Sequence, residues 1–357
     1  MRNLYISHGF FPQEYFSVSA DYIAKVQLPS GAIPWFPDGV LDPWDHVEAA
    51  MGLAVCGFYP QARQAYLWLA ENQEQDGGFW PAYADTQPLD TTRKESHHAP
   101  YAATGLWHYF LLTRDLEFLR MMWPCVEAAL DFACSLQSNH GDIAWALQAN
   151  NETYPDALIT GCSSIYKSLE CGLLIARELG LQRPSWQLSR QQLGKALQEK
   201  PWRFDRTWPS KQHYAMDWFY PILCGVYKQT EAQQRLKSRW QNFVLPDLGC
   251  LCVSNQPWIT VAESCELVMA LLAAGQYSQA ARVFSWLHHN RDQHGAYWTG
   301  FQRELGIYWP REKPTWTAAA VILAADALAG ATSAADLFTG QTMPLREEAA
   351  HLSAAAK

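Results

Sequence analysis

The sequence predicts a single all-α domain over residues 1–330, an (α/α)6 toroid in which six helical hairpins form an inner and an outer ring. Three observations predict this fold: a repeated helix-ending motif, two alternating kinds of helix, and an alternation of short and long connections. Residues 331–357 are rich in alanine and in polar side chains. We expect them to form a C-terminal tail.

A motif of glutamine or a substitute, then glycine, then an aromatic or apolar residue follows six amphipathic segments. Clear copies span 27–35, 73–80 and 137–145, and weaker copies span 198–202, 246–252 and 291–298. Glycine readily adopts the left-handed backbone conformation that ends a helix, and the aromatic side chain can pack back over the helix end. The motif therefore marks the ends of six helices.

Two kinds of helix alternate along the chain. Amphipathic helices are predicted near 12–28, 60–74, 115–137, 187–199, 230–245 and 277–290. Helices rich in Ala, Gly, Leu and Cys are predicted near 43–57, 97–113, 158–178, 213–228, 259–275 and 315–330. Because a helix that is apolar on nearly all faces is buried, we expect the second set to form the inner ring and the first set the outer ring.

The connections predict where a site would lie. Those from inner to outer helices are short, and those from outer to inner helices are long, so all long loops emerge on one face of the ring. Long loops in compact domains are usually functional. Eleven of the 17 tryptophans lie in these loops or at the starts of the inner helices, which predicts an aromatic cavity at one mouth.

Carboxylates near the expected starts of the inner helices would face the same mouth. The candidate catalytic residues are Asp45, Asp217, Glu263 and Glu312. Clustered acids in a low-dielectric cavity have separated pKa values, which general acid/base catalysis uses. We expect Glu263 or Glu312 as general base and Asp45 as acid or substrate ligand. Helix capping is the alternative role for any one of these acids.

The candidate substrate-binding residues are mostly aromatic side chains that can stack on a ligand. They are Trp44, His97, Tyr101, Trp145, Trp218, Trp298 and Trp316. His97 and His98 are adjacent, and neighbours on a helix point in different directions, so we do not expect them to share one site. An ordinary structural role is the alternative for both histidines. Common metal, nucleotide and serine-hydrolase motifs do not occur, so neither a metal nor a cofactor is predicted.

Composition narrows the class of partner. The net charge is −8 with no basic stripe, which argues against a nucleic-acid partner. No apolar stretch approaches the length of a membrane helix, and the N-terminus lacks the apolar run of a signal peptide. The nine cysteines include no C-x-x-C pair, and most fall in apolar helical patterns. We expect a cytoplasmic protein that binds a small molecule or an oligosaccharide.

Several segments resemble the bacterial glucoamylase-like six-hairpin glycosidases. The pattern Asp42-Pro-Trp-Asp45, with later Gly77 and Trp80, is similar to their first hairpin, and parts of 113–132 and 263–281 are similar to later ones. The resemblance implies a sugar-binding cup and inverting hydrolysis by two carboxylates. It also places the family's general acid, a glutamate, directly after a tryptophan. Here Ala146 follows Trp145.

The family's general base precedes the last inner helix, where this chain reads Tyr-Trp-Thr-Gly at 297–300. Other acids would have to replace the two missing ones, and the candidates are Asp142, Asp156, Glu304 and Glu312. The resemblance therefore points to carbohydrate chemistry with a rearranged set of carboxylates.

The glutamine-to-tryptophan repeats also resemble those of terpenoid cyclases and protein prenyltransferases. Those enzymes stabilise carbocations in aromatic cavities by cation–π interactions. The alternative functions are therefore an enzyme or binder of an isoprenoid, and a non-catalytic binder. The cavities would differ, because sugar sites keep polar groups beside each aromatic ring whereas isoprenoid sites are nearly dry and apolar. Asp45, Glu48, Asp217, Glu263 and Glu312 facing one cavity would favour a sugar.

Overall fold

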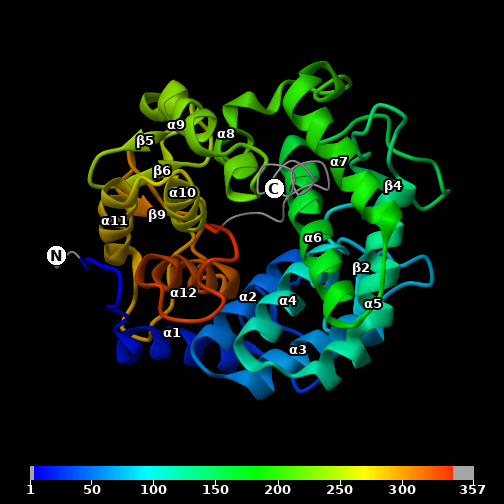
Figure 1. The fold of residues 1–357 in the computed structure, drawn as a ribbon. Coiled ribbons are helices and arrows are strands. Elements are labelled where there is room, and N and C mark those ends of the chain that lie inside the picture. The colour runs from blue at the N-terminus through cyan, green and yellow to red at the C-terminus, as the bar shows by residue number, and fades with distance from the viewer. Residues whose placement is uncertain (1–3, 341–357) are drawn as a thin grey trace, which may run out of the picture.

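The computed structural model describes residues 4–340, and the twelve α-helices of this part of the chain follow one another around a ring (Figure 1). The outer helices are α1 (Gln13–Val26), α3 (Tyr59–Asn72), α5 (Leu116–Ser135), α7 (Pro184–Glu199), α9 (Gln229–Phe243) and α11 (Tyr277–Ser285). The inner helices are α2 (Pro43–Val55), α4 (Tyr101–Thr113), α6 (Ile159–Glu178), α8 (Ala215–Leu223), α10 (Val261–Ala273) and α12 (Thr315–Ala329).

The inner ring is closed. Each inner helix contacts the next one, from α2 with α4 around to α12 with α2. The last contact is so close that a Cβ atom at Gly52 would lie 2.7 Å from the Cβ of Ala319. The predicted (α/α)6 toroid is therefore confirmed.

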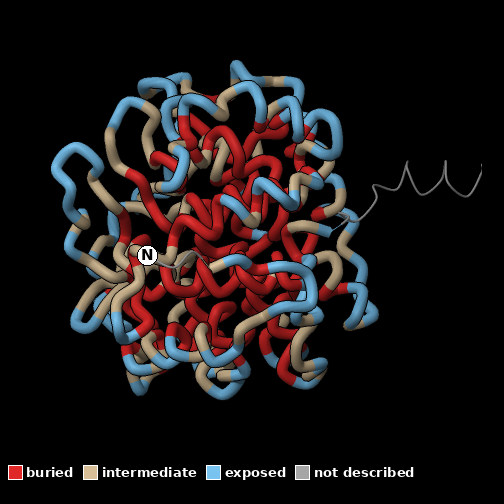
Figure 2. The backbone as a smooth tube through the Cα atoms, turned by 90° about the vertical axis from the view of Figure 1, so that its left-hand side faces the viewer, coloured by how far each residue is buried: buried red, intermediate tan, exposed pale blue. Residues whose placement is uncertain are grey.

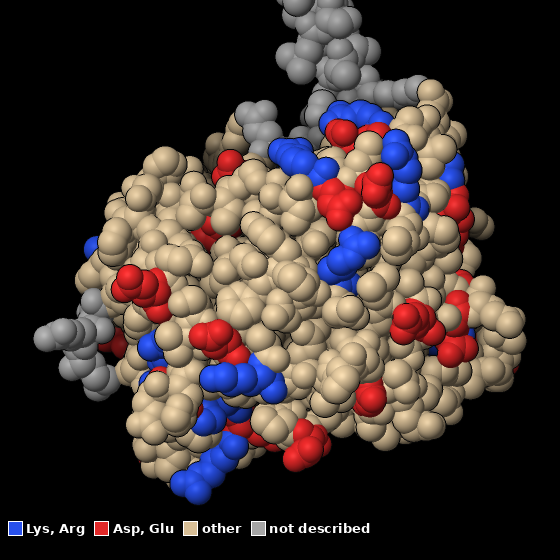
Figure 3. Space-filling model, turned by 90° about the horizontal axis from the view of Figure 1, so that it is seen from below, with Lys and Arg blue, Asp and Glu red and all other residues tan. Residues whose placement is uncertain are grey.

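Burial follows the two kinds of helix that the sequence distinguishes. Nearly every residue of α2 and α12 is buried, whereas the outer helix α9 buries Ala232, Leu236 and Phe243 alone among its residues. In Figure 2 the buried segments fill the centre and the exposed segments form the periphery. The face in Figure 3 shows positive and negative side chains interspersed on a largely uncharged surface.

The helix-ending motif has a second function that the sequence analysis missed. Gly31, Gly77 and Gly141 have φ values of 95°, 86° and 95°, as expected of a helix-ending glycine. The glutamine of each of these copies also donates twice. Gln73 Nε2, for instance, bonds the carbonyl of Gly77 at 2.9 Å and that of Cys125 in the next outer helix at 3.0 Å. The motif therefore ties each of these turns to the neighbouring hairpin.

The long connections contain short antiparallel strands. Two pairs form from β1 (Ala82–Ala84) with β2 (Gln87–Asp90) and from β3 (Arg93–Glu95) with β4 (Ala146–Gln148). A five-stranded sheet has the order β5 (Val244–Leu245), β6 (Gly249–Leu251), β7 (Trp258–Thr260), β8 (Gly300–Gln302) and β9 (Ile307–Tyr308). Three 3-10 turns, η1 (Pro201–Arg203), η2 (Lys211–His213) and η3 (Leu287–Asn290), complete these connections. These strand pairs and turns therefore hold the loops around the mouth of the ring in place.

Residues 331–340 form turns beyond α12, and Leu337 and Phe338 are buried there. The rest of the predicted tail, 341–357, lies outside the described residues. Among residues 4–340, no helix combines the length and hydrophobicity needed to cross a membrane. The nine cysteines are free thiols, and most are buried.

Candidate functional site

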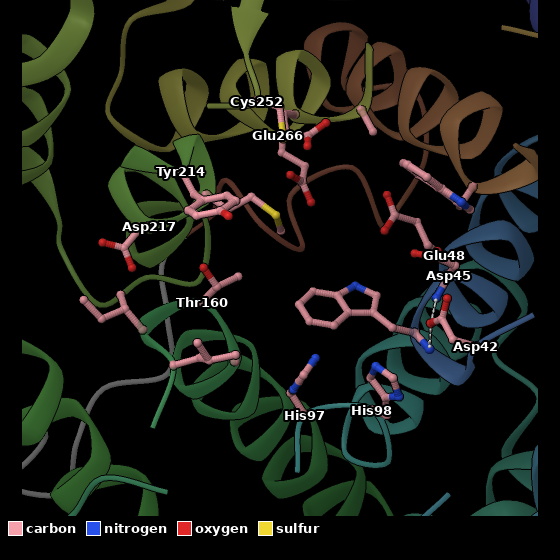
Figure 4. Close-up of a pocket in the computed structure, with 18 of the residues that line it drawn as sticks. Asp42, Asp45, Glu48, His97, His98, Thr160, Tyr214, Asp217, Cys252 and Glu266 are labelled. Carbon is pink, nitrogen blue, oxygen red and sulfur yellow. Dashed lines mark hydrogen bonds between the residues drawn. The ribbon is translucent and has the colours of Figure 1, made fainter. Parts of the chain in front are cut away.

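A cavity of about 550 Å³ opens where the inner helices begin and the long loops gather (Figure 4). Its lining comes from the first turns of α2, α6, α8, α10 and α12, from the turn before α4, and from the loops that precede α2, α8 and α10. Among the predicted residues, it is lined by Trp44, Asp45, His97, Asp217, Glu263 and Trp316. The long connections therefore do meet at one mouth.

Four carboxylates from two inner helices form an acidic wall. Asp45 and Glu48 lie one turn apart on α2, and Glu263 and Glu266 lie one turn apart on α10. Residues three apart share a helix face, so each helix presents both of its acids to the cavity. We refer to these four residues as the acidic wall.

Burial and mutual repulsion raise the pKa values of three carboxyl groups of this wall. Burial, then the neighbouring carboxylates Asp42, Glu48 and Glu266, raise the pKa of Asp45 well above its ordinary value. Burial, Glu48 and Glu263 raise the pKa of Glu266 in the same way. The pKa of Glu48 rises to about 8, again by burial first. Protonated carboxyl groups at neutral pH are the form that a general acid requires.

The carboxyl group of Glu263 has one fully buried oxygen. Its Oε2 atom is buried and has no hydrogen-bond partner among the described residues. A buried polar atom without a partner is costly unless something else satisfies it. Glu263 lines the cavity, and a modest movement of its side chain would let this oxygen accept from a water molecule or a substrate hydroxyl.

Asp42 fixes the start of α2. Its carboxylate accepts hydrogen bonds from the backbone N–H groups of Trp44 at 2.9 Å and Asp45 at 3.0 Å, and from Trp35 Nε1 at 3.0 Å (Figure 4). Pro43 occupies the first helical position, where its missing N–H costs nothing. Asp42 thus caps the helix that carries Asp45, and it orients the Trp35 ring at the cavity rim.

Aromatic rings line the cavity beside the acids. The Trp44 ring lies 4.8 Å from His97, 5.2 Å from Tyr101 and 5.7 Å from Tyr220, measured between ring centroids. Tyr101 packs beneath Trp44 and does not itself line the cavity. Trp316 lines it from α12, and its Nε1 has no hydrogen-bond partner in the described part of the chain.

The two adjacent histidines converge, contrary to expectation. Nε2 of His97 and Nε2 of His98 each lie 3.7 Å from Oε2 of Glu95. The prediction that they cannot share a site is wrong, because residues 96–100 form a turn and α4 begins only at Tyr101. Pro100, which lacks an N–H, stands at the N-cap, so the helix starts later than its apolar pattern suggests.

Within residues 4–340, this histidine cluster is the group whose side chains come close enough to hold a metal ion. The three ligand atoms lie within 4.8 Å of one another. However, Arg93 already bonds Oε1 of Glu95, at 2.8 Å from Nη2, and Trp145 Nε1 donates to Oε2 at 3.2 Å. Both carboxylate oxygens are engaged, and the Arg93 charge opposes a cation. We therefore assign no metal to the cluster.

Apolar and polar side chains line the cavity at α6 and α8. The apolar ones are Leu158 and Ile159 at the start of α6 and Met216 on α8, and Figure 4 shows Thr160, Tyr214 and Asp217 on the same side. Asp217 follows Met216 and is 8% exposed. Burial, then Asp205, raise the pKa of Asp217 to about 6. We refer to Leu158, Ile159 and Met216 as the apolar wall.

The structure does not bring Trp218 or Trp298 into the cavity. Trp218 points from α8 toward the outer helix α9, where Nε1 donates to the carbonyl of Arg235 at 2.7 Å and the ring stacks on Phe243 at 5.2 Å. Trp298 stacks on Tyr308 at 5.2 Å, within the loop that carries the sheet. Each indole packs against a partner outside the cavity, and its position in the sequence alone does not reveal that partner.

Trp145 and Glu312 also lie outside the cavity lining. Trp145 packs against Tyr154 and Trp208, and its indole supports Glu95. Glu312 lies in the loop before α12, where its backbone carbonyl accepts from Thr299. The expectation that these two residues face the mouth is therefore not met, because the strands and turns of the loops direct them elsewhere.

Asp42, Glu48 and Glu266 belong to the site, although they were not among the candidate catalytic residues of the sequence analysis. A three-residue spacing separates Asp42 from Asp45, Asp45 from Glu48, and Glu263 from Glu266. This spacing could have identified the three residues from the sequence, because residues three apart lie on the same face of a helix.

The comparisons with known proteins agree with this geometry. No family model matches the chain. The MMP endo-(1,4)-3-O-methyl-alpha-D-mannosidase of Mycolicibacterium hassiacum is 42% identical over 336 residues, which cover 94% of this chain and 92% of that protein.

Solved structures share the fold at low sequence identity. A D-mannose isomerase has a TM-score of 0.67 at 12% identity, covering 88% of this chain and 95% of its own. A wild-type glycosidase has a TM-score of 0.68 at 14% identity, with 88% and 96% covered. The GH63 mannosylglycerate hydrolase of Thermus thermophilus, in complex with glucose, has a TM-score of 0.67 at 12% identity, with 86% and 99% covered.

A toroid whose mouth gathers buried carboxylates and aromatic rings defines a glycoside hydrolase-like enzyme that acts on carbohydrate. Within that class, the chain belongs to the family of the MMP endo-(1,4)-3-O-methyl-alpha-D-mannosidase. The resemblance to terpenoid cyclases and protein prenyltransferases gains no support from these comparisons. The polar groups beside Trp44 and Trp316 also differ from the dry cavity that an isoprenoid would require.

Proposed function

We propose that this chain hydrolyses internal α-(1,4) bonds between mannose units of a methylated glycan, as the name of its relative describes for that protein. The observation that carries the proposal is the acidic wall, in which Asp45 and Glu263 face one cavity beside Trp44 and Trp316. Aromatic faces stack on sugar rings, and paired carboxylates are the usual catalysts of glycoside hydrolysis.

Asp45 is assigned as the general acid. Its raised pKa favours the protonated form, and it donates that proton to the glycosidic oxygen as the C–O bond breaks. Glu263 is assigned as the general base, because it lines the cavity from α10, on a different helix from Asp45. It takes a proton from water while the water oxygen bonds to the anomeric carbon. The sugar thus gains a hydroxyl group and the leaving chain gains a proton.

The remaining cavity residues bind and position the sugar. Trp44 and Trp316 provide stacking surfaces, and Tyr101 supports Trp44 from below. His97 lines the cavity beside Trp44, and Asp217 accepts from sugar hydroxyls on the α8 side. Glu48 and Glu266, with their raised pKa values, complete the hydrogen bonding of the sugar without adding full negative charge.

The test compares Asp45→Asn and Glu263→Gln with the wild-type chain on α-(1,4)-mannooligosaccharides carrying 3-O-methyl groups. Each variant should lose about a thousandfold or more in kcat, because each removes a proton-transfer group and, for Glu263, the activated water. Glu304→Gln removes an exposed acid outside the cavity and serves as the matched control, with unchanged turnover. Circular dichroism and thermal unfolding establish that all three variants fold.

Two results would contradict the proposal. A folded Glu263→Gln variant with wild-type turnover removes Glu263 from the mechanism. A wild-type chain that cleaves no α-mannoside, methylated or not, removes the reaction itself. Proton NMR of the first product adds the stereochemistry: direct attack by water on an α-bond releases the β-anomer, whereas a covalent intermediate would release the α-anomer.

A further inference from the structure

Helix α6 begins in the cavity without a cap. Leu158 stands at its N-cap position with extended backbone angles, φ −101° and ψ 133°, and no side chain of the described residues caps the helix. The first N–H groups of a helix have no partner within it. Residues 158–161 all line the cavity, so these N–H donors are available to a ligand there.

Three apolar side chains lie beside these donors, and Thr160 and Asp217 add polar groups to the same side of the cavity. Leu158, Ile159 and Met216 are half-buried, and all three line the cavity. A sugar hydroxyl pressed against aliphatic side chains would lose the partner for its proton, which costs free energy. The apolar wall therefore suits a ligand group that accepts hydrogen bonds, carries no proton to donate, and has an apolar surface.

An unpartnered buried histidine borders the same place. His97 is 7% exposed, and its Nδ1 atom has no hydrogen-bond partner among residues 4–340. A Cβ atom on Gly161 would lie 3.2 Å from that nitrogen, so Nδ1 is directed at the first turn of α6. Burial, then His98, lower the pKa of His97 to about 3, so the ring is neutral at physiological pH. A neutral imidazole adds a polar contact without adding charge.

A methyl ether has the chemistry that this corner complements. Its oxygen only accepts hydrogen bonds, and its methyl group is apolar. The acidic wall crowds polar carboxyl groups that exchange hydrogen bonds with sugar hydroxyls, so the methyl group of an ether would find no apolar contact there. We propose that the apolar wall and the uncapped start of α6, bordered by His97, form the subsite that recognises an O-methyl group on a sugar unit of the substrate. This inference rests on the proposed function and adds the residues that determine specificity.

The direct test gives α6 a cap. Leu158→Asn places a good capping residue at a position whose backbone angles already suit one, so that the side chain takes the free N–H donors for itself and also removes apolar surface. Two α-(1,4)-mannotetraosides, one with and one without 3-O-methyl groups, serve as substrates. The ratio of their kcat/KM values should favour the methylated one in the wild type. In Leu158→Asn this ratio should fall about tenfold, the usual scale for losing one apolar contact group.

The control is Lys228→Asn, which caps the outer helix α9 at an exposed position with similar backbone angles, φ −131° and ψ 160°, outside the cavity. It should leave the ratio unchanged. Met216→Gln should lower the ratio several-fold, and Met216→Leu, which restores an apolar side chain of similar size, should return it close to the wild-type value.

A binding measurement separates this inference from the catalytic proposal. Tryptophan fluorescence is titrated with methyl 3-O-methyl-α-mannoside and with methyl α-mannoside, and the wild type should bind the first about tenfold more tightly. A wild type that cleaves neither tetraoside but shows this preference contradicts the proposed function alone. Equal affinity for both ligands, or a Leu158→Asn variant that loses both in parallel, overturns the methyl-ether subsite.

Discussion

The starts of α2 and α6 are equivalent places in the ring, yet they meet the same cavity in opposite ways. At α2, Asp42 caps the helix and takes three N–H donors for itself. At α6, Leu158 occupies the N-cap and takes none. The comparison teaches that one N-cap residue decides whether a helix start keeps its donors within the protein or offers them to a ligand.

The electrostatic difference follows from the same residues. Beyond Asp42, the next turns of α2 carry Asp45 and Glu48, whose pKa values rise because several acids are buried together. Beyond Leu158, the first turn of α6 carries Ile159, Thr160 and Gly161 and no charge. In the proposed mechanism, the carboxyl groups of one side transfer protons, and the other side binds the sugar by its shape and by apolar contact.

Among the variants that test this contrast, the largest effect is expected from removing the cap of α2. Asp42→Ala should lower kcat about a hundredfold, because the backbone that carries Asp45 shifts and small misplacements of catalytic groups have effects of that size. It should also lower the free energy of unfolding by about 1 kcal/mol, as the loss of an N-cap usually does. Steady-state kinetics and urea unfolding measure the two effects.

Asp42→Asn is the matched control for this prediction. Asparagine caps helices as well as aspartate does, so the stability should return to nearly the wild-type value. The kcat should recover in part, because the backbone of α2 is held again. Wild-type kcat in folded Asp42→Ala would show that the cap does not position Asp45, and the contrast between the two helix starts would lose its catalytic meaning.

The next effect concerns the stability of the acidic wall and its dependence on pH. The pKa of Glu48 is about 8 in the folded chain against an ordinary value of 4.5. Below pH 4.5 the group is protonated in both states and adds no penalty. As the pH rises from 4.5 to about 8, the unfolded chain releases this proton while the folded chain keeps it, so stability falls. Above about 8 the penalty is constant.

Glu48→Gln removes this titration and the repulsion it causes. The variant should exceed the wild type in unfolding free energy by on the order of 2 kcal/mol at pH 8, and the two should converge near pH 4.5. Urea unfolding across this range measures the difference. A gap that is equally large at both pH values would show that packing, rather than ionisation, distinguishes the two chains. Asp217→Asn, on the other side of the cavity, gives a smaller comparison because its pKa is only about 6.

The sequence predicts the ring far better than it predicts the walls of the cavity. The alternation of apolar and amphipathic helices is a periodic signal repeated six times, so the inner and outer helices fall close to their predicted ranges. Asp45, Glu263, Trp44 and Trp316 were predicted because helix starts fix which way the first turn faces. The helix start is thus the level at which sequence still determines the direction of a side chain.

Residues of the long loops were predicted less well. Trp145 packs on Tyr154 of its own loop and bonds Glu95 of the preceding long loop, and Trp298 stacks on Tyr308 of its own loop. Glu312 is held by its backbone in the same kind of loop. Trp218 lies two residues beyond Met216 on α8, far enough around the helix to face outward. The outcomes for the loop residues depend on tertiary contacts that no local pattern encodes, whereas the direction of Trp218 follows from helix periodicity.

The smallest expected effect tests the boundary between the histidine cluster and the start of α6. In Gly161→Ala, the added Cβ would lie 3.2 Å from Nδ1 of His97, so the ring must move by a few tenths of an ångström. Alanine favours the helix more than glycine does, so the free energy of unfolding should change by no more than about 0.5 kcal/mol. The preference for the methylated mannotetraoside should fall about threefold, chiefly through KM, because binding rather than proton transfer is disturbed.

Gly172→Ala on the same helix is an unsuitable control for this prediction, since its Cβ would lie 2.1 Å from Leu130 Cδ1 in the core. Ser168→Ala, buried deeper along α6 and bonded to Thr104 at 3.0 Å, is the better one, and it should leave the preference unchanged. Equal loss of preference in both variants would place the effect in the whole helix and not at its start.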